Sequence, residues 1–223
     1  MSEPQQIITI DGPSGSGKST ISRLLAKELG ATYLDTGAMY RAVGLVAQRQ
    51  GVDLEDQEAM GRLLAELDLR LCPGTADTQV LVNGEDVSLA IRTPEMGMMA
   101  SRVSALPVVR QALTAMQQAM AARQAVVAEG RDTGTVVFPQ ARHKFYLSAT
   151  AEERARRRTE QLAEQGMAAN AQEILAQIIK RDHDDSSRSL APLKAAADAV
   201  IIDSSTIPID QVVRVMLETI NRD

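Results

Sequence analysis

One glycine-rich octapeptide near the N-terminus restricts what this chain can fold into more than any other segment. Gly12-Pro13-Ser14-Gly15-Ser16-Gly17-Lys18-Ser19 has the complete G-x-x-x-x-G-K-[ST] spacing of a phosphate loop. Glycines let the backbone wrap closely around phosphate oxygens, and successive N–H groups with the following helix N-terminus supply a positive field. We expect Lys18 to contact the β- and γ-phosphates of ATP, and the Ser19 hydroxyl to bind Mg²⁺. The predicted ATP-binding segment therefore runs from Gly12 to Thr20.

A flexible glycine-serine linker is the alternative interpretation of this segment, and its surroundings argue against it. The preceding run, Ile7 to Asp11, is β-branched and predicts a buried strand. From Gly17 to Leu29 the apolar residues have helical spacing, and Gly30 is a suitable stop. A strand before the loop and a helix after it are the context that a phosphate loop requires.

The rest of the chain alternates between strand-like and helix-like patterns. Short apolar runs predict strands at 33–34, 125–128, 144–147 and 199–203. Helical spacing predicts one helix with Thr36 as its N-cap, others at 54–68, 151–165, 170–188 and 208–221, and two more separated by Pro107. Strands separated by helices imply an α/β fold of the P-loop NTPase type, with a parallel sheet covered by helices on both faces.

A small antiparallel β insert interrupts this alternation. Residues 69–71 and 80–82 alternate apolar and polar side chains, and Asn83-Gly84 is a strong two-residue hairpin turn before residues 85–87. We expect this insert to lie inside an otherwise βα chain.

Composition excludes several other kinds of protein. The chain has 24 basic and 29 acidic residues, two Phe, three Tyr and no Trp, whereas general nucleic-acid binders usually carry a basic excess and stacking aromatics. Two histidines and the single Cys72 cannot form a standard zinc site or an intrachain disulfide. No apolar run approaches the roughly 20 residues of a membrane span, and residues 1–6 lack the pattern of a secretory signal. We expect a cytoplasmic protein that binds neither nucleic acid nor membrane.

Many proteins share the phosphate loop, so the function has to be sought in other residues. A guanine-nucleotide switch would contain Asn-Lys-x-Asp and Asp-x-x-Gly elements, and the chain has neither. Arginines recur instead: Arg41, Arg110, Arg131 at a strand end, Arg154 with Arg156, Arg157 and Arg158 on one helix, and Arg181 and Arg188 on one helical face with Asp185. A solvated surface pair is the alternative explanation for Arg181 and Asp185. An exposed helix face is the alternative for Arg154 to Arg158, and the sequence leaves both open.

Phosphoryl transfer between two phosphates accounts for such a set of arginines. Several anions must meet while water is excluded, and arginine stays charged and holds phosphate oxygens bidentately. An acceptor phosphate is already an anionic nucleophile, so positioning and charge stabilisation suffice for catalysis.

Longer motifs carry a resemblance to a known family. The segments Ile8-Thr9-Ile10-Asp11-Gly12-Pro13, Leu34-Asp35-Thr36-Gly37-Ala38-Met39-Tyr40-Arg41, Glu129-Gly130-Arg131-Asp132-Thr133-Gly134-Thr135-Val136-Val137-Phe138-Pro139 and Arg181-Asp182-x-x-Asp185-x-x-Arg188 resemble the bacterial cytidylate kinases, and the likeness covers essentially the whole chain. The β insert is similar to that family's enlarged monophosphate-binding region.

The resemblance implies roles for individual residues. Thr36, where many members have Ser, would hold the acceptor phosphate with Arg41 and Arg131. Ser101, Arg110 and Asp132 would face cytosine, because a carboxylate can accept from its exocyclic amine. Arg181, Asp185 and Arg188 would lie near the pentose and phosphates. Arg157 and Arg158 would belong to a lid over ATP, and the catalytic set would be Lys18, Arg131, Arg157, Arg158 and Arg181.

The first hypothesis is therefore a kinase that converts ATP and CMP or dCMP into ADP and CDP or dCDP, with Mg²⁺ as cofactor. We expect one P-loop kinase unit over 1–223, a monophosphate-binding insert at about 54–105, a lid at about 154–170, and a monomer. A kinase for another base or metabolite is one rival. A regulatory nucleotide-binding protein without turnover is another, although a pure ATP sensor needs no second phosphate site.

Overall fold

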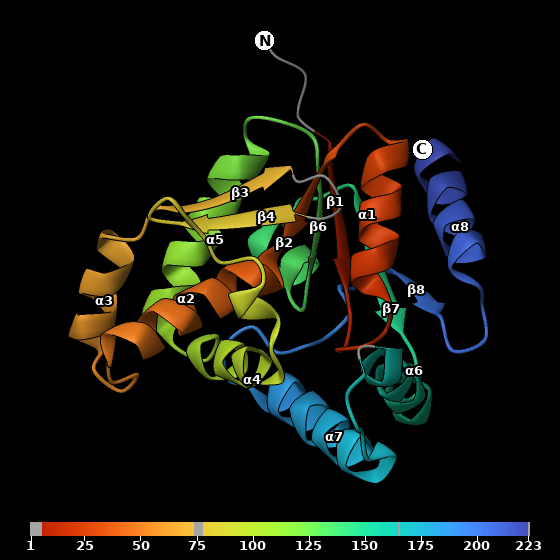
Figure 1. Cartoon of the computed structure of the whole chain (residues 1–223). Coiled ribbons are helices and arrows are strands. Elements are labelled where there is room, and N and C mark those ends of the chain that lie inside the picture. The colour runs from red at the N-terminus through yellow and green to blue at the C-terminus, as the bar shows by residue number, and fades with distance from the viewer. Residues whose placement is uncertain (1–5, 74–77, 165, 223) are drawn as a thin grey trace. The chain divides into compact units, whose positions relative to one another are not determined.

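The computed structural model describes residues 6–73, 78–164 and 166–222, and its contacts divide the chain into two compact units. We call Met1–Tyr33 together with Gln124–Asp223 the loop unit, because it contains the phosphate loop, and Leu34–Arg123 the inserted unit. Figure 1 shows the elements of both. The predictions for residues 1–5, for 74–77 of the insert and for residue 165 of the lid lie outside the described residues.

A parallel β-sheet organises the loop unit. Its strands are β1 (Ile7–Asp11), β2 (Thr32–Asp35), β6 (Val126–Gly130), β7 (His143–Ser148) and β8 (Val200–Asp203), in the order β2-β6-β1-β7-β8. The boundary of the two units falls within β2, after Tyr33. Strand β1 pairs in parallel with β6 and β7, and β7 with β8. Helices flank the sheet, so the predicted α/β fold with a parallel sheet is confirmed.

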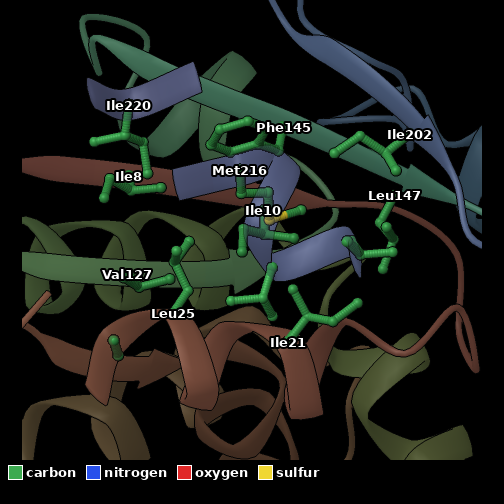
Figure 2. Close-up of a cluster of buried hydrophobic side chains, with 13 residues drawn as sticks. Ile8, Ile10, Ile21, Leu25, Val127, Phe145, Leu147, Ile202, Met216 and Ile220 are labelled. Carbon is green, nitrogen blue, oxygen red and sulfur yellow. The ribbon is translucent and has the colours of Figure 1, made fainter. Parts of the chain in front are cut away.

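Apolar side chains from the sheet and two helices form the core of this unit (Figure 2). Ile8 and Ile10 of β1 and Phe145 of β7 are almost completely buried. They belong to one cluster with Leu25 of α1 (Lys18–Glu28) and Met216 of α8 (Ile209–Arg222), which pack together. This packing fixes α1, and therefore the loop at its N-terminus, against the carboxyl end of β1.

Gly12 allows the chain to leave β1 against its neighbour β7. Its φ is +149°, and a Cβ atom there would lie 2.0 Å from the carbonyl oxygen of Leu147. Any side chain would therefore separate the two strands or push the loop away from the sheet.

Two packed helices, α6 (Ala151–Glu164) and α7 (Ala171–Ser187), follow β7. The Asn170 side chain caps α7 by accepting a hydrogen bond from the Gln172 N–H at 3.0 Å. Between β6 and β7 the chain forms a single wide helical turn, η2 (Thr133–Val137).

The inserted unit combines helices with a small sheet. Its elements are α2 (Thr36–Gln50), α3 (Gln57–Ala65), β3 (Leu69–Pro73), β4 (Thr78–Val82), β5 (Glu85–Asp86), η1 (Ala90–Arg92), α4 (Pro94–Val103) and α5 (Pro107–Ala121). The antiparallel order β3-β4-β5 confirms the β insert. Asn83 and Gly84 both have positive φ, 49° and 84°, as the predicted hairpin turn requires.

The predicted N-cap of α2 was wrong by one residue. Asp35, not Thr36, is the cap: its Oδ1 accepts a hydrogen bond from the Ala38 N–H at 2.8 Å, and Thr36 is the first helical residue. An aspartate carboxylate satisfies the free N–H groups of the first turn as well as a threonine hydroxyl does, and here the strand ends directly on it. Helix α3 also begins later than predicted, at Gln57, because Asp56 caps it.

Within the described part of the chain, no helix combines the length and the apolar character needed to cross a membrane.

Candidate active site

Lys18 lies folded over the phosphate loop. Its ammonium donates to the Pro13 carbonyl at 2.7 Å and to the Ser16 hydroxyl at 3.4 Å, and only 4% of the residue is exposed. Burial lowers the pKa of Lys18 to about 7, and the charge of Arg131 acts in the same direction. Glu129 and Asp11 act in the opposite direction, and a phosphate placed beside this ammonium would add to their effect.

Ser19, the expected Mg²⁺ ligand, donates to a carboxylate that the sequence interpretation missed. Its hydroxyl bonds to Glu129 Oε1 at 2.8 Å, and Tyr33 donates to Glu129 Oε2, also at 2.8 Å. Among the described residues, no three His, Cys, Asp or Glu side chains gather to hold a metal ion by themselves. A hydroxyl beside a carboxylate offers the hard oxygen donors that Mg²⁺ takes alongside nucleotide phosphates.

Asp11 joins the end of β1 to the turn that follows β6. Its carboxylate accepts from the N–H and hydroxyl of Thr133 and from the Gly134 N–H, each at 2.8 Å. Burial raises the pKa of Asp11, and these hydrogen bonds oppose that rise. Because Thr133 directly follows Arg131 and Asp132 in the chain, this contact holds that pair close to the strand that leads into the phosphate loop.

A buried carboxylate, Asp185, lies between two of the predicted arginines. Its Oδ2 accepts from Arg131 Nε at 2.9 Å, and its Oδ1 is 3.9 Å from Arg188 Nη1. Burial raises the pKa of Asp185, but the charges of Arg131, Arg181 and Arg188 outweigh burial and lower it below its ordinary value. The alternative of a solvated surface pair is therefore wrong for Asp185, which is 3% exposed.

Helix α7 also reaches the phosphate loop. Arg181 donates through Nη1 to the Ser14 hydroxyl at 3.3 Å. One residue further, Asp182 accepts two hydrogen bonds from the buried Arg154 of α6, at 3.0 and 2.5 Å. The arginine cluster of α7 and the phosphate loop are thus neighbours within one unit.

The basic residues of α6 do not form one uniform face. Arg154 is 4% exposed, Arg157 donates to the Ser204 carbonyl at 2.5 Å, and Arg158 donates to Gln161 on the surface. The exposed-face alternative is wrong for Arg154, whereas Arg156 does lie in a surface network with Glu153 and Glu160.

Predicted residues in the inserted unit form a second group. Arg41 pairs with Asp35 at 3.2 Å. Arg110 donates to the Ser104 carbonyl at 3.0 Å and lies over the Tyr40 ring, while the Ser104 hydroxyl donates to the carbonyl of Ser101 at 2.8 Å. The structure therefore brings Arg110 and Ser101 together through Ser104. Thr36 is buried at the start of α2.

The residues that sequence reasoning missed are structural neighbours of the predicted ones. They are Asp11, Tyr33, Asp35, Tyr40, Glu129, Asp182 and Ser204. Five of them lie in the motifs that carry the family resemblance, and this position was the available signal: Asp11, Asp35, Tyr40, Glu129 and Asp182. Ser204 follows the last strand and had no signal of its own.

Comparison with known proteins places this architecture in a family. A family model described as cytidylate kinase matches residues 8–222. A protein named cytidylate kinase from Citrifermentans bemidjiense is 50% identical over 96% of this chain and 92% of its own length. Another of that name from Azotobacter vinelandii is 50% identical over 100% of this chain and 99% of its own. The crystal structure of an uncharacterized protein from Eubacterium ventriosum is similar in fold, with a TM-score of 0.55 at 13% identity over 98% of this chain and 99% of its own. The chain belongs to the cytidylate kinase family.

Proposed function

We propose that this protein transfers the γ-phosphoryl group of ATP to CMP or dCMP, giving ADP and CDP or dCDP. The observation that carries the proposal is the hydrogen bond of Arg181 to Ser14, because it brings an arginine cluster against the phosphate loop. A protein that only sensed ATP would need one anion site, whereas transfer between two phosphates needs two adjacent ones. The family and the names of its members support cytosine as the acceptor base.

The phosphate loop would hold ATP through its backbone N–H groups. Lys18 would exchange its hydrogen bond to the Pro13 carbonyl for one to a phosphate oxygen. Arg131 and Arg181 would stabilise the charge that develops during transfer, and no general base is needed because the acceptor is already an anion. Arg157 would complete the catalytic set from its place beside Ser204, and Arg158 would join it once the lid closes.

Mg²⁺ would be held by the Ser19 hydroxyl and the nucleotide phosphates, with Glu129 orienting the hydroxyl. Bound there, the ion would neutralise part of the phosphate charge and align the β- and γ-phosphates.

The family resemblance supports a set of acceptor-binding residues. We assign Thr36, Arg41 and Arg131 to its phosphate, Ser101, Arg110 and Asp132 to cytosine, and Arg181, Asp185 and Arg188 to the pentose and phosphates. The ion pair of Asp185 with Arg131 supports these roles, because it fixes a guanidinium group just after the carboxyl end of β6.

We further propose that the segment 54–105 binds the monophosphate and that 154–170 forms the lid. The protein would act as a monomer in the cytoplasm, without nucleic acid or membrane. The single Cys72 is consistent with a reducing compartment.

ADP release with CMP, dCMP, UMP, AMP and GMP offered in turn at equal concentration tests the function. We expect CMP and dCMP to be far better acceptors than AMP and GMP. Lys18→Ala should abolish transfer while circular dichroism shows an unchanged fold. If AMP is the best acceptor, the kinase has another base specificity; turnover by a folded Lys18→Ala variant would refute the site itself.

A further inference from the structure

We propose that Arg154 and Ser204 are positioning residues for ATP, which hold two carbonyl groups of the phosphate loop from outside and thereby orient the N–H groups of Gly15 and Gly17. The inference rests on the proposed function only in taking ATP as the ligand of this loop. It explains why a buried arginine and a buried serine, neither part of the loop, contact its backbone.

Arg154 binds the backbone of the loop at Ser14. Its Nη1 donates to the Ser14 carbonyl at 3.1 Å, while its Nε donates to the Ala149 carbonyl at 2.9 Å. The same guanidinium makes the two hydrogen bonds to Asp182, so its plane is fixed from three directions. Such a group cannot swing away to reach a substrate.

Ser204 grips the loop two residues further on. Its hydroxyl lies 3.0 Å from the carbonyl oxygens of both Ser16 and Ser148, and the residue is 3% exposed. Arg157 donates to the Ser204 carbonyl and fixes its backbone from the side of α6. Ser16 is therefore tied to the carboxyl ends of β7 and β8.

Because of the geometry of the peptide group, contacts to these carbonyl oxygens also fix the direction of the N–H groups that follow them. In a planar trans peptide, the C=O of one residue and the N–H of the next point in opposite directions, and the described chain contains no cis peptide. A Ser14 carbonyl directed at Arg154 turns the Gly15 N–H away from Arg154. A Ser16 carbonyl directed at Ser204 does the same for the Gly17 N–H.

Gly15 has a second role in this arrangement. Its φ is +80°, and a Cβ there would lie 3.3 Å from the Cβ of Arg154. The absence of a side chain therefore lets α6 approach the loop, in addition to permitting the left-handed backbone. Preoriented N–H groups bind an anion without first reorganising, so their loss should weaken ATP binding specifically.

Ser204→Ala and Arg154→Lys test the inference, with Ser205→Ala as the matched control. Ser205 is the next residue, and its hydroxyl donates to Asp203 and accepts from the Thr150 N–H. Calorimetry would measure the Kd for ATP with Mg²⁺ and, separately, the Kd for CMP. We expect ATP to bind about tenfold more weakly to each test variant. The Kd for CMP should stay within about twofold of the wild-type value, a difference below about 0.5 kcal/mol. The control variant Ser205→Ala should bind both nucleotides as the wild-type protein does.

NMR chemical shifts of the backbone amides distinguish the loss of an oriented N–H group from general damage to the site. On adding ATP, Ser204→Ala should lose the shift of the Gly17 amide and keep that of Gly15, and Arg154→Lys should show the reverse. Unchanged ATP affinity in both variants would overturn the inference, as would an equal loss for ATP and CMP. If the wild-type protein binds ATP but does not phosphorylate CMP, the proposed function is wrong. The ATP affinities of the variants then still test the roles of Arg154 and Ser204.

Discussion

The carboxylate of Asp185 stays charged in the interior because guanidinium groups surround it. Arg131 and Arg188 contact it, and the net effect is a pKa below the ordinary value of 3.8. A carboxylate whose pKa is lower in the folded state contributes stability above the unfolded pKa. That contribution disappears as the pH falls from about 3.8 through the lower folded value.

Asp185→Asn should therefore destabilise the protein in a pH-dependent way. We expect the free energy of unfolding at pH 7 to fall by about 3 kcal/mol, because the change leaves buried guanidinium groups without their anion. The difference from wild type should shrink as the pH is lowered below 4. Urea unfolding between pH 7 and pH 3.5 measures it.

Asp184→Asn provides the control for this prediction. Asp184 is the neighbouring aspartate and pairs with Lys180 at 2.6 Å, but its side chain is 45% exposed. Such a surface pair contributes about 0–1 kcal/mol. If both variants lose the same stability at every pH, burial of the Asp185 charge is not the cause.

At the scale of elements, two helical glycines should respond to alanine with opposite signs. Gly44 in α2 faces α4, and a Cβ there would lie 2.5 Å from Met99 Cγ and 3.2 Å from Met99 Cβ. Gly61 in α3 has only Val108 Cγ2 near its Cβ position, at 3.9 Å. We expect Gly44→Ala to cost about 1–3 kcal/mol by overpacking and Gly61→Ala to gain about 0.5–1 kcal/mol from helix propensity.

Thermal and urea unfolding of the two variants would check this pair. A difference in stability between the two variants reflects the local surroundings of each glycine, because both substitutions add the same methyl group to the middle of a helix. A stabilised Gly44→Ala protein would mean that α2 and α4 separate easily, and would contradict the close packing of these helices.

Local elements were predictable to the extent that their signals are local. Apolar periodicity and the Asn83-Gly84 turn depend on neighbouring residues, and the corresponding strands, helices and hairpin form within a few residues of the predicted positions. The cap of α2 was misassigned because Asp35 and Thr36 are both good caps, and only the end of β2 decides between them. The sheet order β2-β6-β1-β7-β8 pairs β1 with β6 and β7, which lie far from it in the sequence, and periodicity cannot reveal such pairing.

The candidate site shows the same division at the scale of the whole molecule. Lys18 and Ser19 follow from the spacing of one loop, and Arg131 from its place at a strand end. Their neighbours Glu129, Asp11 and Ser204 are defined by tertiary contacts across long stretches of chain. Charge alone could not separate the buried Arg154 from the exposed Arg156, because they differ only in the face of α6 they occupy.

The structure suggests where movement of the proposed lid would begin. Arg154 and Arg157, in the first half of α6, are tied to the phosphate loop and to Ser204. Arg158, in contrast, donates a hydrogen bond to Gln161 of its own helix, on the surface. After α6 the chain turns at Gly166, whose φ is +73°, and the Met167 N–H donates a hydrogen bond to the Leu162 carbonyl. Within the proposed lid, 154–170, we therefore expect residues 154–157 to be its fixed base and the moving part to start after Arg157.

A bisubstrate analogue that joins ATP to CMP should close this lid. Water must be excluded while the anions meet, and products must then leave, so the analogue should bind a closed state better than an open one. We expect amide hydrogen exchange in 158–170 and in the β insert, 69–92, to slow by about tenfold, equivalent to about 1.4 kcal/mol. Exchange in α8 should not change, because that helix belongs to the core. Unchanged exchange in 158–170 at saturating analogue would contradict the lid and leave Arg158 as part of an ordinary solvated face, whereas slowing of 158–170 with no change in 69–92 would restrict closure to the ATP side.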